Sequence, residues 1–137
     1  MYRIAINKER PDFRVFIDLL YGTDRNVDTE GDSDPVNSRT WTYLYIADRE
    51  TDDPSVEVGA IRENPNVFEV ESKSNELEEV AALYLFLYCG TSIAVGSKAL
   101  GVKEIENLKR QYAPHLLRAE SSIWHNSTNG EPYPNLA

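Results

Sequence analysis

The chain has 137 residues and a formal net charge of −9 at pH 7, with 41% hydrophobic and 27% charged residues. This length and apolar content predict a folded domain and exclude an acidic disordered tail. Because an acidic protein repels phosphates, we expect it to bind neither nucleic acid nor an anionic membrane. Cys89 is the only cysteine, which excludes an internal disulfide, and we expect a cytoplasmic protein.

The negative charge is concentrated in residues 24–79. This segment has 16 acidic and 5 basic residues, which gives 5 − 16 = −11, whereas residues 1–23 and 80–137 each have a net charge of +1. Such a block produces a strong local field that attracts cations or a basic protein, at the cost of self-repulsion. It is the clearest indication of function in the sequence.

The N-terminal part of the chain is expected to contain a strand, a helix and a loop. Residues 2–6 alternate weakly between apolar and polar side chains, which favours a strand that could join the edge of the sheet formed by the later strands. Residues 11–21 have apolar side chains at helical spacing, and Pro11 suits the first turn of a helix. Residues 23–39 contain almost no apolar side chains, so we expect a long exposed loop there.

Three strands are expected next, at residues 40–48, 55–62 and 66–71. All three segments are rich in β-branched and aromatic residues. The connectors, residues 49–54 and 63–65, have the composition of turns. Because such short connectors join neighbouring antiparallel strands, the pattern predicts a β-meander.

Residues 75–89 are expected to form a helix. Ser74 suits its N-cap, acidic residues lie in its first turn, and Gly90 is expected to end it as the C′ residue. Residues 80–97 contain no charged side chain, and this run is about as long as the shortest segment that can span a membrane. However, glycines and hydroxyl residues interrupt it. We therefore expect a buried core helix that is followed by a flexible connector.

The C-terminal part is expected to contain a helix around residues 102–112, a break at Pro114 and a short last helix up to Trp124. We expect residues 1–124 to form one domain and residues 125–137 to be a loose tail. The predicted fold class is α+β, with a small antiparallel β-meander of about three to four strands packed against α-helices.

The period-2 alternation assigns the side chains of the meander to two faces. One face is apolar and is expected to pack on the helices; it consists of Leu44, Ile46, Val56, Val58, Phe68 and Val70. The other face would combine aromatic and acidic side chains, namely Trp41, Tyr43, Tyr45, Glu57, Glu69 and Glu71. Because aromatic rings anchor interfaces, we predict that a partner binds these six residues and four acids of the preceding loop, namely Asp28, Glu30, Asp32 and Asp34. The alternative interpretations are that a second helix covers the aromatic side chains, or that these side chains simply shield the sheet.

Motifs for catalysis, cofactors and metals are weak. The acidic loop has EF-hand-like spacing with Gly31 at the sixth position, but Asn37 replaces the bidentate glutamate and Pro35 obstructs the exiting helix. Gly90 and Gly96 resemble a phosphate-binding loop only in part, because their spacing is one residue too long. The sequence therefore predicts no catalytic, cofactor-binding or metal-ligating residue and no cofactor.

These features favour a binding protein over an enzyme. The most concrete prediction is an immunity or inhibitor protein that neutralises a basic protein partner, such as a nuclease toxin, by charge complementarity. One alternative is a small enzyme with a carboxylate-based site between the sheet and helix 75–89. Another is a DNA-mimicking inhibitor, whose carboxylates would replace phosphates. Neither the partner's identity nor the oligomeric state follows from the sequence.

Overall fold

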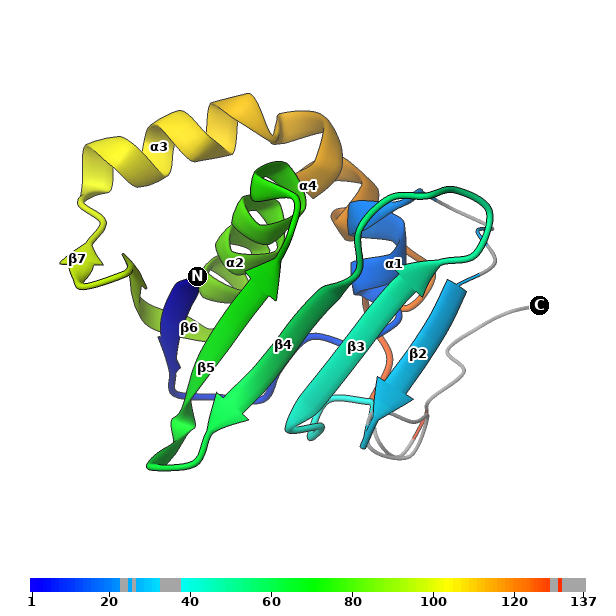
Figure 1. The fold of residues 1–137 in the computed structure, drawn as a ribbon, viewed down its shortest axis with the longest axis horizontal. Coiled ribbons are helices and arrows are strands. Elements are labelled where there is room, and N and C mark those ends of the chain that lie inside the picture. The colour runs from blue at the N-terminus through cyan, green and yellow to red at the C-terminus, as the bar shows by residue number, and fades with distance from the viewer. Residues whose placement is uncertain (23–24, 26, 33–37, 129–130, 132–137) are drawn as a thin grey trace.

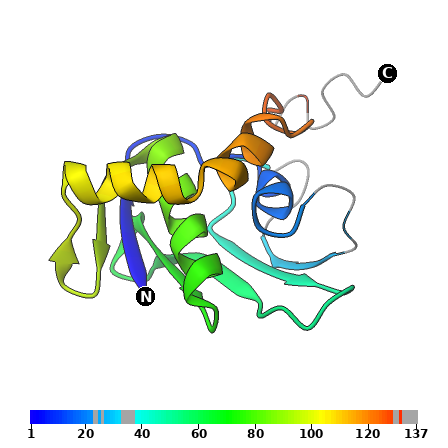
Figure 2. The same ribbon diagram turned by 90° about the horizontal axis from the view of Figure 1, so that it is seen from above.

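The computed structural model describes residues 1–22, 25, 27–32, 38–128 and 131. Its strands are β1 (Tyr2–Ile6), β2 (Val27–Gly31), β3 (Tyr43–Asp48), β4 (Val56–Ile61), β5 (Asn64–Ser72), β6 (Gly90–Val95) and β7 (Lys98–Ala99). Its helices are α1 (Val15–Leu20), α2 (Asn75–Cys89), α3 (Val102–Gln111) and α4 (Ala113–Glu120). The strands form one antiparallel sheet in the order β2-β3-β4-β5-β1-β6-β7, and the helices lie on one side of it (Figures 1 and 2).

The predicted α+β class and the β3-β4-β5 meander are confirmed, but the expected three to four strands were too few. The segment expected to be a long loop contains β2, which pairs with β3. The segment expected to be a flexible connector forms the β6–β7 hairpin, in which Gly96 adopts a positive φ of 59° at the turn. β6 pairs with β1, so β1 lies inside the sheet and not at its edge.

The strand boundaries differ from the expected ones at both ends of the meander. β3 begins at Tyr43, because residues 38–40 form a turn. β5 begins at Asn64, so the turn between β4 and β5 is shorter than the expected 63–65 connector. A register shift at Ala60 and Ile61 accommodates this tight connection, and Pro65 is tolerated beside it.

One hydrophobic core lies between the sheet and the helices. The six apolar meander residues that we expected on the helix side are all 0–1% exposed. The predicted position of Trp41 is wrong: this residue was expected on the opposite face of the sheet but is fully buried in this core. Its ring packs edge-on against Phe16 and Phe68, with centroids 5.9 and 5.7 Å away, and its Nε1 donates to the Pro11 carbonyl at 3.0 Å. Trp41 precedes β3, so the alternation of the strand does not apply to it.

The limits of α2 are those expected from the sequence. The Ser74 hydroxyl accepts a hydrogen bond from the Leu77 amide at 3.2 Å and so caps the helix. Gly90 differs from the expected left-handed C′ residue, because its backbone is extended (φ −87°, ψ 154°) and already belongs to β6. A Cβ at this position would lie 2.8 Å from Phe86 Cα, so the sharp turn from helix to strand requires glycine.

The remaining helices also depart from the expected pattern. α1 begins only at Val15, so Pro11 lies outside it. Pro114 lies in the first turn of α4 and so begins this helix, where we had expected a break. α4 ends at Glu120, so Trp124 belongs to the turns that follow it.

The described start of the C-terminal tail contacts the domain. Arg39 donates a hydrogen bond to the His125 carbonyl at 2.7 Å and another to the Ser127 carbonyl. The Ser127 hydroxyl donates to the buried Asp12 carboxylate, which also pairs with Arg14 at 2.6 Å. These contacts hold residues 125–127 in place, although we expected the tail to be loose from His125 onward.

The uncharged run at residues 80–97 is divided between the end of α2 and β6. Within the described residues, no helix combines the length and the apolar character that crossing a membrane requires.

Candidate functional site: the open face of the sheet

The face of the sheet that points away from the helices carries most of the predicted site. Figure 1 looks onto this side, where β2 to β5 lie in front of the helices. The register places on it Arg3, Asp28, Glu30, Tyr43, Tyr45, Glu57, Gly59, Glu69 and Glu71, which we call the open face. No helix of the described residues covers Tyr43, which is 40% exposed. The alternative interpretation, in which a helix covers the aromatic side chains, is therefore wrong for Tyr43.

One row of the open face crosses four strands and is acidic. Glu30 of β2 lies opposite Tyr45 of β3, Tyr45 lies opposite Glu57 of β4, and Glu57 lies opposite Glu71 of β5. Neighbouring strands are about 4.8 Å apart, so the Glu57 and Glu71 side chains leave the sheet side by side on the same face. Like charges in directly opposed positions destabilise a sheet. The fold therefore tolerates a repulsive pair at the centre of this face.

A second row orients an aromatic ring. Tyr43 lies opposite Gly59, and a Cβ at Gly59 would come within 3.0 Å of the Tyr43 ring. The ring therefore rests on the glycine and is held against the sheet. Burial and the nearby Glu57 carboxylate raise the pKa of the Tyr43 phenol, so the ring is neutral at physiological pH. Neither Gly59 nor its role was predicted from the sequence, although a glycine within a strand is itself a signal of close packing.

Two arginines compensate part of the negative charge. Arg3 Nε lies 2.8 Å from the Glu69 carboxylate, and Arg49 Nη2 lies 2.9 Å from Asp28. Both arginines were missed as site residues, because only the register brings them to these acids. Within the described residues, no basic group forms an ion pair with Glu57 or Glu71. The uncompensated negative charge is therefore centred on this pair.

The surface around Glu57 and Glu71 is hollowed. A hollow of about 170 Å³ lies between these two carboxylates, Tyr43 and Glu69. A neighbouring hollow of about 380 Å³ shares Glu57 and Glu71 and extends to Lys73. Both hollows open to solvent at the centre of the face, which gives a protruding side chain of a partner a place to enter.

The remaining predicted site residues have other positions. Asp32 accepts hydrogen bonds from the Thr42 hydroxyl and from the Thr42 and Tyr43 amides at 2.6–3.0 Å, so it holds the start of β3. Burial opposes the ionisation of Asp32, but these hydrogen bonds outweigh it and lower the pKa of the carboxyl. Asp34 lies outside the described residues, and Trp41 lies in the core.

The described part of the acidic segment, residues 27–32, does not have the geometry of an EF-hand loop. Asp28 and Glu30 lie on the extended strand β2, whereas an EF-hand loop curls around its ion. No three potential ligands among His, Cys, Asp and Glu gather into a metal-binding group in the part of the chain that the structure describes.

The carboxylates at the N-terminal end of α2 make structural contacts. Glu79 accepts hydrogen bonds from the Tyr2 and Tyr112 hydroxyls, both at 2.7 Å, and Glu78 pairs with the amino group of Met1 at 2.8 Å. Burial and the hydrogen bonds to Glu79 raise the pKa of both phenols, which therefore keep their protons. These contacts tie β1, α2 and the end of α3 together.

Cys89 is inert in this fold. Its side chain is 1% exposed, and its Sγ contacts the Leu85 carbonyl at 3.4 Å. Burial raises the pKa of the thiol to about 11, so it is not a nucleophile at neutral pH.

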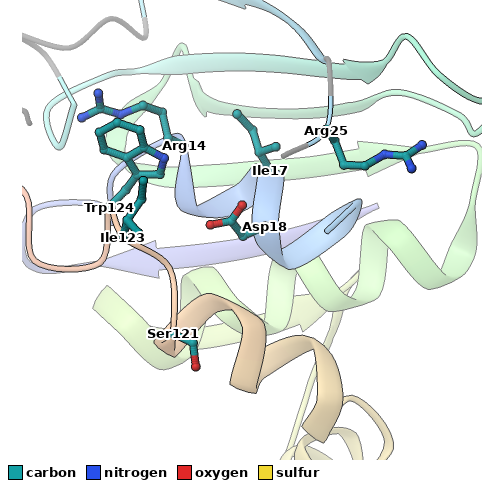
Figure 3. Close-up of a pocket in the computed structure, with 7 residues that line it drawn as sticks. All are labelled: Arg14, Ile17, Asp18, Arg25, Ser121, Ile123 and Trp124. Atoms are coloured by element: carbon teal, nitrogen blue, oxygen red, sulfur yellow. The ribbon is translucent and has the colours of Figure 1, made fainter. Parts of the chain in front are cut away.

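A cavity of about 430 Å³ lies between α1 and the segment that follows α4 (Figure 3). On one side of this cavity the Arg14 guanidinium stacks on the Trp124 ring, with its Cζ 3.9 Å from the ring centroid. Arg25 lies on the other side and points away from the cavity. Both cations are already paired, Arg14 with Asp12 at 2.6 Å and Arg25 with Asp48 at 2.7 Å. Because internal carboxylates neutralise them, the cavity does not have the chemistry of an anion site.

Comparisons with protein-family models, with curated proteins and with solved structures gave no match.

Proposed function

We propose that the protein binds a basic protein partner through the open face of the sheet. The observation that carries this proposal is the pair Glu57 and Glu71 at the centre of an aromatic and hollowed surface. The two residues oppose each other, and neither forms an ion pair with a basic group of the described residues. A cationic side chain of a partner would remove their repulsion and form charge-assisted hydrogen bonds with both carboxylates. The binding energy would then include relief of a strain that exists in the free protein.

Tyr43 and Tyr45 supply the apolar part of such an interface. The Tyr43 ring is held on Gly59, so little conformational entropy is lost when a partner covers it. An arginine that enters the hollow beside this ring would contact its π face and the carboxylates together. The acidic row would increase the association rate, and the aromatic rings would slow dissociation.

The most concrete form of this function is an inhibitor or immunity protein that occupies a basic toxin, such as a nuclease. The net charge of −11 on residues 24–79 supports this form, because nuclease surfaces that bind phosphate are positively charged. Contact across several strands would cover an extended surface of the partner, as a steric inhibitor requires.

The proposal can be tested with three forms of the protein as bait in pull-downs from its native host at low salt. The forms are the wild type, the double variant Glu57→Lys/Glu71→Lys, and the control Glu63→Lys/Glu104→Lys. Glu63 and Glu104 are exposed and lie outside the open face, in the β4–β5 turn and in α3. The control therefore makes the same change in net charge.

We expect a basic protein to be captured by the wild type and the control, to be lost with the open-face variant, and to be released by high salt. Equal loss with both variants would show that net charge alone causes the capture. Capture by all three forms would contradict a role for the Glu57 and Glu71 pair.

A further inference from the structure

A second candidate site lies on the helical side of the molecule, where α2 meets α3, α4 and the segment after α4. A cavity of about 190 Å³ is lined on one side by Tyr84, Leu87 and Tyr88 of α2. Leu116 of α4 and the His125 ring complete its walls. An apolar cavity of roughly 150 Å³ is enough to bind benzene, so this cavity has the size of one aromatic ring with a small substituent.

Two polar atoms of this cavity's side chains have no hydrogen-bond partner. The Tyr84 side chain is 5% exposed, and its hydroxyl group is buried and unpaired. Nδ1 of His125 is also buried and unpaired. Of the four such atoms in the part of the chain that the structure describes, two therefore belong to side chains that line this cavity. Unpaired buried groups are rare in native proteins, because each loses its hydrogen bond to water.

The walls and the rim indicate the chemistry of a ligand. The rings of Tyr84, Tyr88 and His125 follow one another with centroids 6.1 and 6.4 Å apart, which provides aromatic surface. Burial raises the pKa of Tyr84, so its hydroxyl keeps the proton and can donate it. Lys109 and Glu120 contribute one charge of each sign to the rim. Lys109 also pairs with Glu106 at 3.5 Å, so its charge is partly compensated and an anionic ligand is not favoured over a neutral one.

We propose that this cavity binds a neutral, single-ring aromatic compound that carries both a hydrogen-bond donor and an acceptor. An aromatic carboxamide is the simplest example. Its carbonyl would accept from the Tyr84 hydroxyl, and its N–H would donate to His125 Nδ1. Because neither protein atom is exposed to solvent in the free protein, binding would require both side chains to move toward the cavity. The site is separate from the open face, which lies on the other side of the sheet.

Benzamide is the probe, and chemical shifts of backbone amides in the ¹⁵N-labelled protein are the readout. We expect saturable shifts centred on residues 84–88 and 116–125, with a Kd on the order of 1 mM for a ligand of this size. Toluene has the same ring without the polar group, and benzoate replaces the amide by a charge. Both are expected to bind more weakly than benzamide.

Two tyrosine variants separate binding from folding. Tyr84→Phe is expected to weaken benzamide binding by about 2- to 10-fold, the effect of one lost hydrogen bond, without lowering the stability of the free protein. Tyr112→Phe is the matched control, since it removes the 2.7 Å hydrogen bond to Glu79 outside the cavity. It is expected to lower stability and to leave benzamide binding unchanged.

Several results would overturn the proposal. These are the absence of saturable shifts, equal affinities for toluene and benzamide, and a benzamide affinity that Tyr84→Phe does not change. A loss of stability in Tyr84→Phe as large as that in Tyr112→Phe would also overturn it. That result would show that the Tyr84 hydroxyl is already bonded, for example to a trapped water, in the free protein.

Discussion

The opposed carboxylates of Glu57 and Glu71 should make the free protein less stable than a variant in which one of them is neutral. Directly opposed residues of antiparallel strands have Cβ atoms about 5 Å apart. Two unit charges about 5.5 Å apart repel by about 0.8 kcal/mol in bulk water. With a Debye length of about 8 Å at physiological ionic strength, screening reduces this repulsion to about 0.4 kcal/mol.

Glu71→Gln is therefore expected to raise the free energy of unfolding by about 0.4 kcal/mol at physiological salt and by only about 0.1 kcal/mol at 1 M salt. Urea denaturation at the two salt concentrations measures this difference as a shift of the midpoint at constant m value. Glu69→Gln is the matched control on the same strand and face. It removes the ion pair with Arg3, so it should leave stability unchanged or lower it.

A double-mutant cycle with Glu57→Gln assigns the effect to the pair. Once one carboxylate has been neutralised, the second substitution should bring no further gain, because the repulsion is already absent. A destabilising Glu71→Gln, or a gain that does not depend on salt, would show that the two carboxylates do not repel each other. The proposal that this face favours a cationic partner would then lose its physical basis.

Three further predictions test the fold and its packing. Leu83 is fully buried, so Leu83→Ala should lower the free energy of unfolding by about 2–5 kcal/mol in urea denaturation. Leu87 is 40% exposed, so Leu87→Ala should lower it by less than about 1 kcal/mol. Equal losses would contradict the orientation of α2. Gly59→Ala should destabilise the protein by about 1 kcal/mol, because the new Cβ would displace the Tyr43 ring, and a gain in stability would refute that contact. Burial lowers the pKa of His115, so its contribution to stability is present above about pH 6.5 and is lost as the pH falls. His115→Gln should therefore reduce the difference in stability between pH 5 and pH 7.5. An unchanged difference would contradict the lowered pKa.

The sequence predicted the features that depend on local chemistry. Both ends of α2 were predicted, because the Ser74 cap and the glycine after Cys89 act within one turn of the helix. The alternation in residues 40–71 predicted the meander and its helix side, because a single core buries alternate residues of every strand. The same alternation brought Tyr43 and Glu57 to the open face.

The features that depend on distant contacts were not predicted. β2 has a polar sequence and no fully buried residue, and its pairing with β3 at the edge of the sheet stabilises it. β6 was interpreted as a connector because Gly90, Thr91 and Ser92 favour turns, but pairing with β1 overrides that preference. Trp41 was placed on the wrong face because the start of β3 depends on the turn before it. The ion pair between Arg3 and Glu69 joins strands far apart in the chain, so only the register shows it.

The association rate between the protein and its captured partner tests the central claim most directly. Between about 0.1 M and 1 M salt the Debye length falls from about 10 Å to about 3 Å, so the rate for the wild type should fall steeply. Glu57→Lys/Glu71→Lys should show a slow rate already at low salt, whereas Glu63→Lys/Glu104→Lys should keep most of the wild-type rate. Tyr43→Ala should leave the association rate unchanged and speed dissociation. An association rate that ignores both salt and the Glu57 and Glu71 reversal would contradict the account.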